Sequence, residues 1–410
     1  MDSRIVMDNK IRQDIPLWEN GVAKNITFIV TKDCQLACKY CYLVGKNSKE
    51  RMSWDVARQA IDYVLSQKDY NQPSVVWDFI GGEPFLEIEL IDRICDYIKT
   101  EMYRLQHPWF NSYRFSFSTN GINYHEPRIQ HFIEKNRTHL SIGITIDGTE
   151  KKHDLNRIYK KSGRGSYQDV VRNIPLWLSQ FPGGNTKVTI SSDDIPYICE
   201  SVLHLYELGI KDVAINCVFE DVWKDGDDVV FEQQLVDLAD VIIDHELYQE
   251  HFCSFFMEHI GKPLNPDTDN RNWCGAGMML AIDSVGNFYP CTRFAQYSLR
   301  NKPAWIIGNV KDGIDSNKLR PFLTLDRTTQ SAAECVNCEV ASGCAWCQGE
   351  NYDAADTHTL YQRSTAICKM HKARVRANNY YWNKLFRKLE LEGRREEFEK
   401  QKEKVKNPVC

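Results

Sequence analysis

Thr31-Lys-Asp-Cys34-Gln-Leu-Ala-Cys38-Lys-Tyr-Cys41 directly follows a β-rich run and places three thiols within eight residues. A structural zinc site needs four closed ligands, usually as paired Cys-x-x-Cys knuckles. A [4Fe–4S] cube can be held by three thiolates, which leaves its fourth iron free for another ligand. The spacing therefore favours an iron–sulfur cluster with one open iron.

Six β-rich runs alternate with helix-like segments around and after this stretch. The segments 53–68, 87–104 and 167–181 carry apolar residues at three- and four-residue steps, as helices packed on a parallel sheet do. This alternation predicts an α/β fold with right-handed crossovers, and functional residues just past the strand ends. The six runs are 25–31, 74–80, 113–119, 140–146, 187–192 and 212–219.

The composition limits the class of protein. The 410 residues are 42% hydrophobic, and 51 Lys and Arg stand against 56 Asp and Glu, which excludes a disordered chain and argues against nucleic acid as the main partner. No apolar run has the length of a membrane helix, and charges lie near the start where a signal peptide would be apolar, so we expect a cytoplasmic protein with no membrane partner. Fifteen cysteines in a reducing compartment indicate metal or redox chemistry.

The strand–helix repeat stops after residue 219, and a different region follows. An acidic, helix-like stretch at 227–259 leads through a Pro-rich turn at 262–266 into seven cysteines between Cys274 and Cys368. Two apolar runs around the turn 283–286 predict a hairpin. We therefore expect an N-terminal extension (1–24), a partial barrel of six strand–helix units (25–225), a bridging helical segment (226–270), a small metal-stapled domain (271–370) and a C-terminal surface helix (371–410).

Three further strand ends carry short motifs, namely Gly81-Gly82-Glu83-Pro84, Ser118-Thr119-Asn120-Gly121, and Asp147-Gly148 followed by Arg157. Each motif alone is an ordinary turn or helix cap, but four such elements in this order, counting the cysteine loop, favour a cofactor site. Together they resemble the radical SAM superfamily. The resemblance implies a partial (β/α)6 barrel in which Cys34, Cys38 and Cys41 hold a [4Fe–4S] cluster, whose free iron binds S-adenosylmethionine.

The same resemblance implies a set of S-adenosylmethionine contacts. The Gly-Gly-Glu-Pro element is expected to hold the amino group, and its glycines to let main chain approach the ligand. Arg157 is expected near the ligand carboxylate and Tyr40 beside the adenine. The full expected set is Tyr40, Gly81, Gly82, Glu83, Pro84, Ser118, Asn120, Asp147 and Arg157.

The later cysteines, in the order Cys274, Cys291, Cys335-x2-Cys338-x5-Cys344-x2-Cys347 and Cys368, resemble the SPASM domain, which carries two auxiliary [4Fe–4S] clusters. The last gap of the four-cysteine run is two residues where the family usually has three. By resemblance, Cys335, Cys338, Cys344 and Cys368 hold a closed auxiliary cluster II, and Cys274, Cys291 and Cys347 hold auxiliary cluster I. Residues 276–284 contain no further cysteine, so cluster I should have an open iron. Two structural zinc sites are the alternative.

The implied chemistry is hydrogen abstraction by a 5′-deoxyadenosyl radical, for which the protein supplies orientation and shielding. Residues 17–28 and 41–48 resemble peptide maturases whose targets contain Cys-x-x-x repeats and which form thioether crosslinks, as in ranthipeptides or sactipeptides. The resemblance implies a ribosomally made, cysteine-rich precursor peptide as substrate and an external one-electron reductant of the flavodoxin or ferredoxin type. Many such maturases recognise the leader of the precursor peptide with an N-terminal domain, and the expected extension is short for such a domain. Leader binding by a separate partner, leader binding by the bridging segment, and no leader binding at all stay open.

Two alternatives to thioether formation stay open. An anaerobic sulfatase maturase would oxidise a Cys or Ser to formylglycine, but Thr292 stands where its pattern has an Asp base. A zinc-stapled, peptide-binding scaffold would do no chemistry.

The other cysteines have simpler interpretations as buried or incidental thiols. We expect Cys95, Cys199 and Cys253 on helices, Cys217 on the sixth strand and Cys410 at the terminus.

Overall fold

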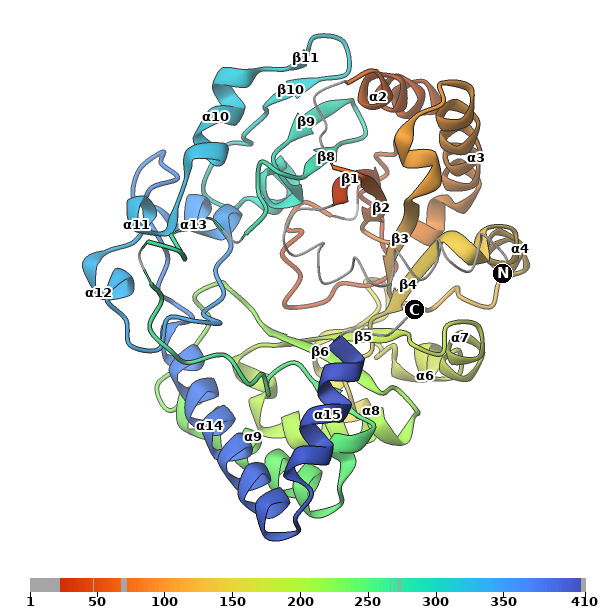
Figure 1. The fold of residues 1–410 in the computed structure, drawn as a ribbon. Helices are drawn as coiled ribbons and strands as arrows, with labels where there is room; N and C mark the ends of the chain where they lie inside the picture. The colour runs from red at the N-terminus through yellow and green to blue at the C-terminus, as the bar shows by residue number, and fades with distance from the viewer. Residues whose placement is uncertain are drawn as a thin grey trace.

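A parallel four-stranded sheet forms the centre of the fold in the computed structural model, which describes residues 23–46, 48–67, 72–265, 267–270, 272 and 274–406. A second sheet lies beside β4, where Thr186 Oγ1 donates to the Ile144 carbonyl at 2.8 Å. The strands curve around the middle of the molecule, and the helices lie outside them (Figure 1). All six predicted strands are confirmed, as β1 (Ala23–Thr31), β2 (Ser74–Gly81), β3 (Tyr113–Thr119), β4 (Leu140–Ile144), β5 (Asn185–Ile190) and β6 (Asp212–Cys217).

Helices connect these strands, as the apolar periodicity predicts. They are α2 (Trp54–Ser66), α3 (Ile88–Arg104), α4 (Pro127–Asn136), α5 (Glu150–Asn156), α6 (Tyr167–Val171), α7 (Ile174–Gln180) and α8 (Ile198–Glu207). The single helix predicted over 167–181 is wrong, because Asn173 interrupts it and donates to the Gly121 carbonyl at 2.8 Å. Pro175 lies in the first turn of α7, where its missing N–H costs no helical hydrogen bond.

The two faces of the main sheet differ in polarity. Phe28, Phe79 and Phe117 are in register on neighbouring strands, with ring centroids 5.7 and 5.1 Å apart. Phe117 also packs against Phe132 of α4, so this apolar face is the one that the helices cover. The residues that alternate with them point the other way, into the interior of the partial barrel.

The bridging segment is only partly helical, contrary to prediction. Helix α9 (Asp227–Asp244) ends before Glu246, which has a left-handed φ of 54°. The chain then forms β7 (Phe252–Cys253), which pairs in parallel with β6 and completes the sheet β5-β6-β7. Cys253 therefore lies on a strand and not on the predicted helix. The predicted positions of Cys95 on α3, Cys199 on α8 and Cys217 on β6 are confirmed.

The predicted hairpin is confirmed, with β8 (Leu280–Ile282) and β9 (Asn287–Tyr289) joined by a turn in which Gly286 has a φ of 91°. Strand β8 pairs in parallel with β1, with Ile26 opposite Leu280. With β10 (Gly308–Asn309) and β11 (Gly313–Ile314), the hairpin thus extends the barrel sheet to the order β11-β10-β9-β8-β1-β2-β3-β4. Short helices α10 (Ser316–Thr324), α11 (Arg327–Gln330), α12 (Ala333–Val336) and α13 (Gln348–Ala354) follow.

The C-terminal region is two helices where one was predicted. Helix α14 (Cys368–Leu391) lies along α9, and Lys384 of α14 is 2.8 Å from Asp240 of α9. Gly393, with a φ of 67°, separates α14 from α15 (Arg395–Lys406). The predicted N-terminal extension, except Ala23 and Lys24, and Cys410 lie outside the described residues.

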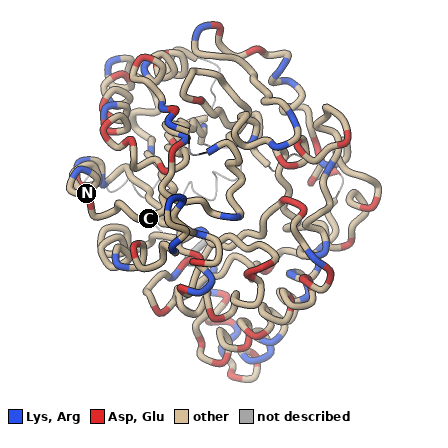
Figure 2. The backbone as a smooth tube through the Cα atoms, turned by 180° about the vertical axis from the view of Figure 1, so that it is seen from behind, with Lys and Arg blue, Asp and Glu red and all other residues tan. Residues whose placement is uncertain are grey.

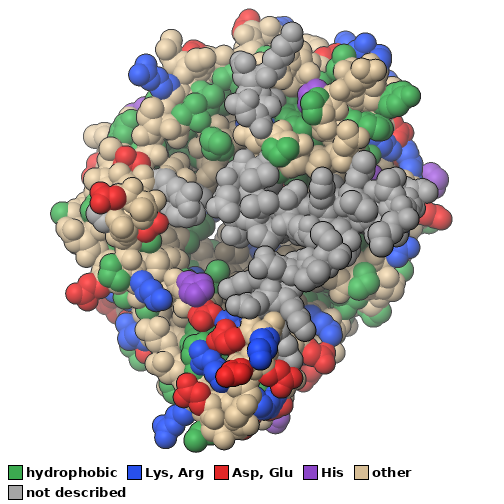
Figure 3. Space-filling view, viewed as in Figure 1, with side chains coloured by type: hydrophobic (Ala, Val, Ile, Leu, Met, Phe, Trp, Pro, Cys, Tyr) green, Lys and Arg blue, Asp and Glu red, His purple; other side chains and the backbone are tan. Residues whose placement is uncertain are grey.

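Charges of both signs are interspersed over the molecule (Figure 2). Acidic and basic side chains lie side by side over the region of α15 in the space-filling view (Figure 3). In the described part of the chain, no helix combines the length and the apolar character that a membrane crossing requires.

Candidate functional site

The three-cysteine loop lies directly after β1, against the ends of β2 and β3. Cys34 is buried, and Cys38 and Cys41 are half-buried. Burial raises the pKa of the Cys34 thiol to about 12, and the negative charges of Glu83 and Cys38 add to that rise. The charge of Cys41 contributes to the raised pKa of Cys38, so the structure brings the three thiols together. Crowded, buried thiols of this kind ionise readily only beside a cation, which fits a metal cluster.

Gly81 and Gly82 fit the end of β2 against this loop. A Cβ at Gly81 would lie 2.3 Å from the Thr31 carbonyl oxygen, and one at Gly82 would lie 2.1 Å from that of Asp33. The backbone N–H groups of Gly82 and Glu83 donate to these same two oxygens, at 2.9 and 2.8 Å. The space that the missing side chains leave is therefore filled by the cysteine loop itself, so the close approach is between two stretches of protein backbone.

Glu83 ties the ends of β2 and β3 to the loop. Its buried carboxylate accepts from Thr119 Oγ1 at 2.7 Å and from the Asn120 N–H at 2.7 Å. The Asn120 side chain donates to Gln35 Oε1 at 3.0 Å and lies 3.9 Å from Cys34 Sγ. Burial raises the pKa of Glu83, and its hydrogen bonds oppose that rise. Pro84 is buried beside it, and Ser118 is exposed at the same end of β3.

Tyr40, Asp147 and Arg157 form a buried polar group opposite Glu83. The Tyr40 hydroxyl donates to Asp147 Oδ2 at 2.5 Å and accepts from Arg157 at 2.9 Å. Arg157 Nε is buried and has no hydrogen-bond partner among the described residues. A buried guanidinium with a free N–H suits a carboxylate ligand, which is compatible with the carboxylate of S-adenosylmethionine. The contacts of Arg157 with that carboxylate and of Tyr40 with the adenine stay predictions.

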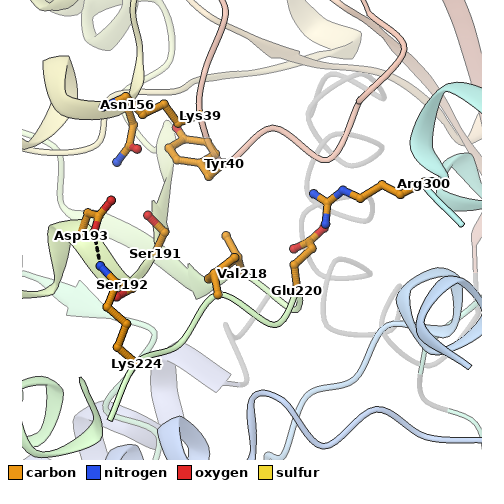
Figure 4. Close-up of a pocket in the computed structure, with 11 residues that line it drawn as sticks. Lys39, Tyr40, Asn156, Ser191, Ser192, Asp193, Val218, Glu220, Lys224 and Arg300 are labelled. Carbon is orange, nitrogen blue, oxygen red and sulfur yellow. Dashed lines mark hydrogen bonds and ion pairs between the residues drawn. The ribbon is translucent and has the colours of Figure 1, made fainter. Parts of the chain in front are cut away.

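A cavity of about 200 Å³ opens beside Tyr40 (Figure 4). Ser191 and Glu220, which follow β5 and β6, line it together with Arg300, whose guanidinium points toward Glu220 in the close-up view. Sequence reasoning missed these three residues, although the rule that pocket residues follow strand ends would have found Ser191 and Glu220. Its lining also includes Lys39 of the cysteine loop, so the cavity contacts that loop and, through Arg300, the cysteine-rich region.

Cys274, Cys291 and Cys347 come together from separate segments. Charges on Cys274 and Cys347 raise the pKa of Cys291, after burial as the main cause. The Gln348 N–H donates to Cys274 Sγ at 3.5 Å. The strongest charged neighbours of these three thiols among the described residues include no fourth cysteine.

Arg293 is the cation beside this group. It forms an ion pair with buried Glu220 at 2.6 Å and lies over the Tyr42 ring at 4.2 Å. Its positive charge opposes the burial that raises the pKa of Cys347. Arg293 therefore links the cavity, through Glu220, to the three thiols.

Cys335, Cys338, Cys344 and Cys368 form the third group. Charges on the other three cysteines raise the pKa of Cys344, after burial as the main cause. Arg363 donates to Cys344 Sγ at 3.0 Å and lies over the Trp346 ring at 4.3 Å. In the part of the chain that the structure describes, no three His, Cys, Asp or Glu side chains are placed to hold a single metal ion, which gives no support to structural zinc sites.

The interior of the barrel carries a half-buried carboxylate, Asp78 of β2. It lies opposite Thr27 of β1 and Ser116 of β3, and Thr27 Oγ1 is 3.5 Å from its Oδ2. Burial raises the pKa of Asp78 to about 6 from its ordinary value of 3.8. The ionised carboxylate at neutral pH is therefore held at a cost in folding free energy.

Asp78→Asn is expected to stabilise the protein at pH 7 by on the order of 1 kcal/mol. Because the folded state holds this proton more tightly, stability falls as the pH rises from 3.8 to about 6, and the Asn variant should lose that part of the pH dependence. Urea unfolding between pH 4 and 8 measures both effects, with Asp221→Asn, at an exposed position, as control. A variant less stable than wild type at pH 7 would contradict the interpretation.

Comparison with known proteins shows that part of this chain is similar to a known family. Residues 28–191 match the family model of the radical SAM superfamily. The uncharacterized protein MJ0907 of Methanocaldococcus jannaschii is 31% identical over 194 residues, which are 47% of this chain and 62% of that protein, so the chain spans less than two thirds of that relative.

Solved structures share the fold at lower identity. The structure of anSMEcpe with bound AdoMet and Kp18Cys peptide is 16% identical, with a TM-score of 0.62 over 89% of this chain and 98% of that one. SuiB of Streptococcus suis bound to the precursor peptide SuiA is 15% identical, with a TM-score of 0.57 over 87% and 79%. At these identities the two comparisons show a similar fold and nothing about activity.

Proposed function

We propose that the protein is a radical SAM enzyme, as the match of residues 28–191 to that superfamily supports, and that it modifies a ribosomally made, cysteine-rich precursor peptide by forming thioether crosslinks from Cys sulfur to carbon. Cys34, Cys38 and Cys41 would hold the [4Fe–4S] cluster that the family implies. With S-adenosylmethionine, that cluster would supply a 5′-deoxyadenosyl radical able to take one hydrogen atom from unactivated carbon. An external one-electron reductant of the flavodoxin or ferredoxin type would reduce this cluster. When the carbon–sulfur bond forms, the thiol proton would leave to solvent and the auxiliary clusters would accept the second electron.

The residues around the loop are arranged to orient S-adenosylmethionine. The Glu83 carboxylate, which accepts from the Asn120 N–H, would attract an ammonium group, and the free Nε–H of Arg157 would suit a carboxylate. Tyr40 holds Arg157 in place through its hydroxyl, and Asp147 fixes that hydroxyl in turn. The protein thus contributes position and exclusion of water.

The observation that carries the thioether proposal is the grouping of Cys274, Cys291 and Cys347 without a fourth cysteine among their strongest charged neighbours. Three thiols on auxiliary cluster I leave one position for a substrate thiolate, and Cys335, Cys338, Cys344 and Cys368 would hold the closed cluster II. Arg293 adds positive charge beside Cys347, and Glu220 orients Arg293 at the cavity wall. A substrate cysteine in the cavity would lie in a field that favours its anion.

Formylglycine formation of the sulfatase-maturase kind is the second candidate, because the fold resembles that of anSMEcpe solved with a peptide. Thr292 occupies the position of the Asp base in that pattern. Its side chain hydrogen-bonds the Tyr42 hydroxyl, and a threonine does not serve as a base at neutral pH. This disfavours the second candidate.

The proposal predicts a mass loss of two hydrogens per crosslink when the reconstituted protein meets a cysteine-rich precursor peptide encoded beside its gene. Three four-iron clusters correspond to about twelve irons per chain, which an iron assay measures first. Mass spectrometry then follows the peptide, and the spectrum of cluster I should change when the peptide binds. A Cys-to-Ser peptide is the control and should neither perturb that spectrum as strongly nor crosslink. Formylglycine in place of the thioether would favour the second candidate, and zinc without iron would favour a scaffold.

A further inference from the structure

The interior of the barrel is polar, whereas the interior of a closed strand–helix barrel is usually packed with branched apolar residues. On β5, exposed Asn185 and Lys187 alternate with buried Thr186 and Val188. The same alternation occurs on the neighbouring strands. Inward positions that are exposed or half-buried include Asp78, Ser116, Ser118, Ser141, Asn185, Lys187 and Asn216. An interior of this kind is built to receive polar groups.

Lys187 is a cation at an inward position of β5. It has no hydrogen bond and no ion pair with any residue in the described ranges. The charged groups that act on it are Arg293, Asp78 of β2 and Cys347. One of the thiols assigned to auxiliary cluster I is therefore among its charged neighbours.

Asp78 does not neutralise Lys187 at contact distance. The Asp78 carboxylate accepts hydrogen bonds from the hydroxyls of Thr27 and Ser116, its neighbours on the same sheet. Arg293 carries the same charge as Lys187 and does not neutralise it. Lys187 is exposed at an inward position and has no partner among the described residues, so its ammonium group is available to an anion that enters the interior.

We infer that Lys187 binds a carboxylate of the substrate peptide, so that the peptide carries an acidic group close to its reacting cysteine. The inference rests on the proposed function for the identity of the ligand as a peptide. Two sources share this chemistry, an Asp or Glu side chain and the C-terminal carboxylate.

The test uses the anaerobically reconstituted protein and four pools of synthetic peptides with one cysteine each. Three pools are C-terminally amidated and differ at one position, which is Asp, Asn or Lys, and the fourth has Asn there with a free C-terminal carboxylate. Fluorescence anisotropy measures binding. The Asp pool should bind about tenfold or more tightly than the Asn and Lys pools. If the free C-terminus alone confers tight binding, the C-terminal carboxylate is the source.

Variants identify the residue responsible. Lys187→Met should bring the Asp pool to the affinity of the Asn pool, and Lys187→Glu should reverse the preference toward the Lys pool, which a merely structural role would not do. Asn216→Ala, a neutral inward position on β6, is the matched control and should keep the preference. Should Lys187→Met fail to fold, the inference is still tested by the binding of the four pools to the wild type and by the preference of Lys187→Glu. Equal binding of the Asp, Asn and free-carboxylate pools to wild type, or a preference that survives in Lys187→Met, would overturn the inference.

Mass spectrometry of the same mixtures separates this inference from the proposed function. Acid-dependent binding without any crosslinked product supports a role for Lys187 and contradicts thioether formation. Crosslinking that is equal in all pools supports thioether formation and contradicts the role of Lys187.

Discussion

Simultaneous replacement of Cys34, Cys38 and Cys41 with Ala is expected to abolish 5′-deoxyadenosine formation from S-adenosylmethionine. The three thiols lie together on one loop, between Glu83 and the Tyr40–Asp147–Arg157 group, so nothing else in the described part of the site offers three sulfurs at that place. The other two cysteine groups lie on different segments and should keep their clusters. Chromatography of the nucleoside product and an iron assay measure the two effects together.

Cys95→Ala provides the matched control, because Cys95 is a buried thiol on α3 with no place in the site. It should reconstitute with a full complement of iron and cleave S-adenosylmethionine as the wild type does. Unchanged cleavage in the triple variant would remove the radical SAM chemistry from this loop.

Gly82→Ala is expected to lower S-adenosylmethionine cleavage by about 100-fold or more, since displacements near 1 Å in an active site have effects of that size. The added Cβ would lie 2.1 Å from the Asp33 carbonyl oxygen, a backbone atom that cannot move away without moving the cysteine loop. The hydrogen bonds from Gly82 and Glu83 to Thr31 and Asp33 would be disturbed with it. The electron paramagnetic resonance spectrum of the reduced first cluster, with and without S-adenosylmethionine, reports the change.

Gly183→Ala serves as the comparison, because a Cβ at Gly183 meets no atom within 4 Å and its backbone is not left-handed. It should leave cleavage and spectra unchanged. If Gly82→Ala cleaves as well as Gly183→Ala, the contact between β2 and the loop does not position the cluster.

Only part of the candidate site is visible in sequence order. Cys34, Cys38 and Cys41 share one short loop, and Glu83 and Asn120 each follow a strand, so local spacing is enough to single them out. Lys187 gave no such signal, because a lone lysine on a strand is usually a solvated side chain. Its position in the barrel depends on how β5 lies relative to β2, which no local pattern encodes.

The six barrel strands, the hairpin and the sulfur-rich loops could be predicted from local sequence, because strand alternation, turn residues and ligand spacing are properties of neighbouring residues. The helical prediction for 227–259 was wrong in part, because the helix ends before the left-handed residue Glu246 and the chain then forms β7, which pairs with β6. No local pattern predicted that β8 pairs with β1, and the proximity of Cys347 to Cys291 was implied only by the family resemblance before the fold brought them together. Pairings between residues so far apart depend on the free energy of the whole chain, in which burial and backbone hydrogen bonding must be satisfied together.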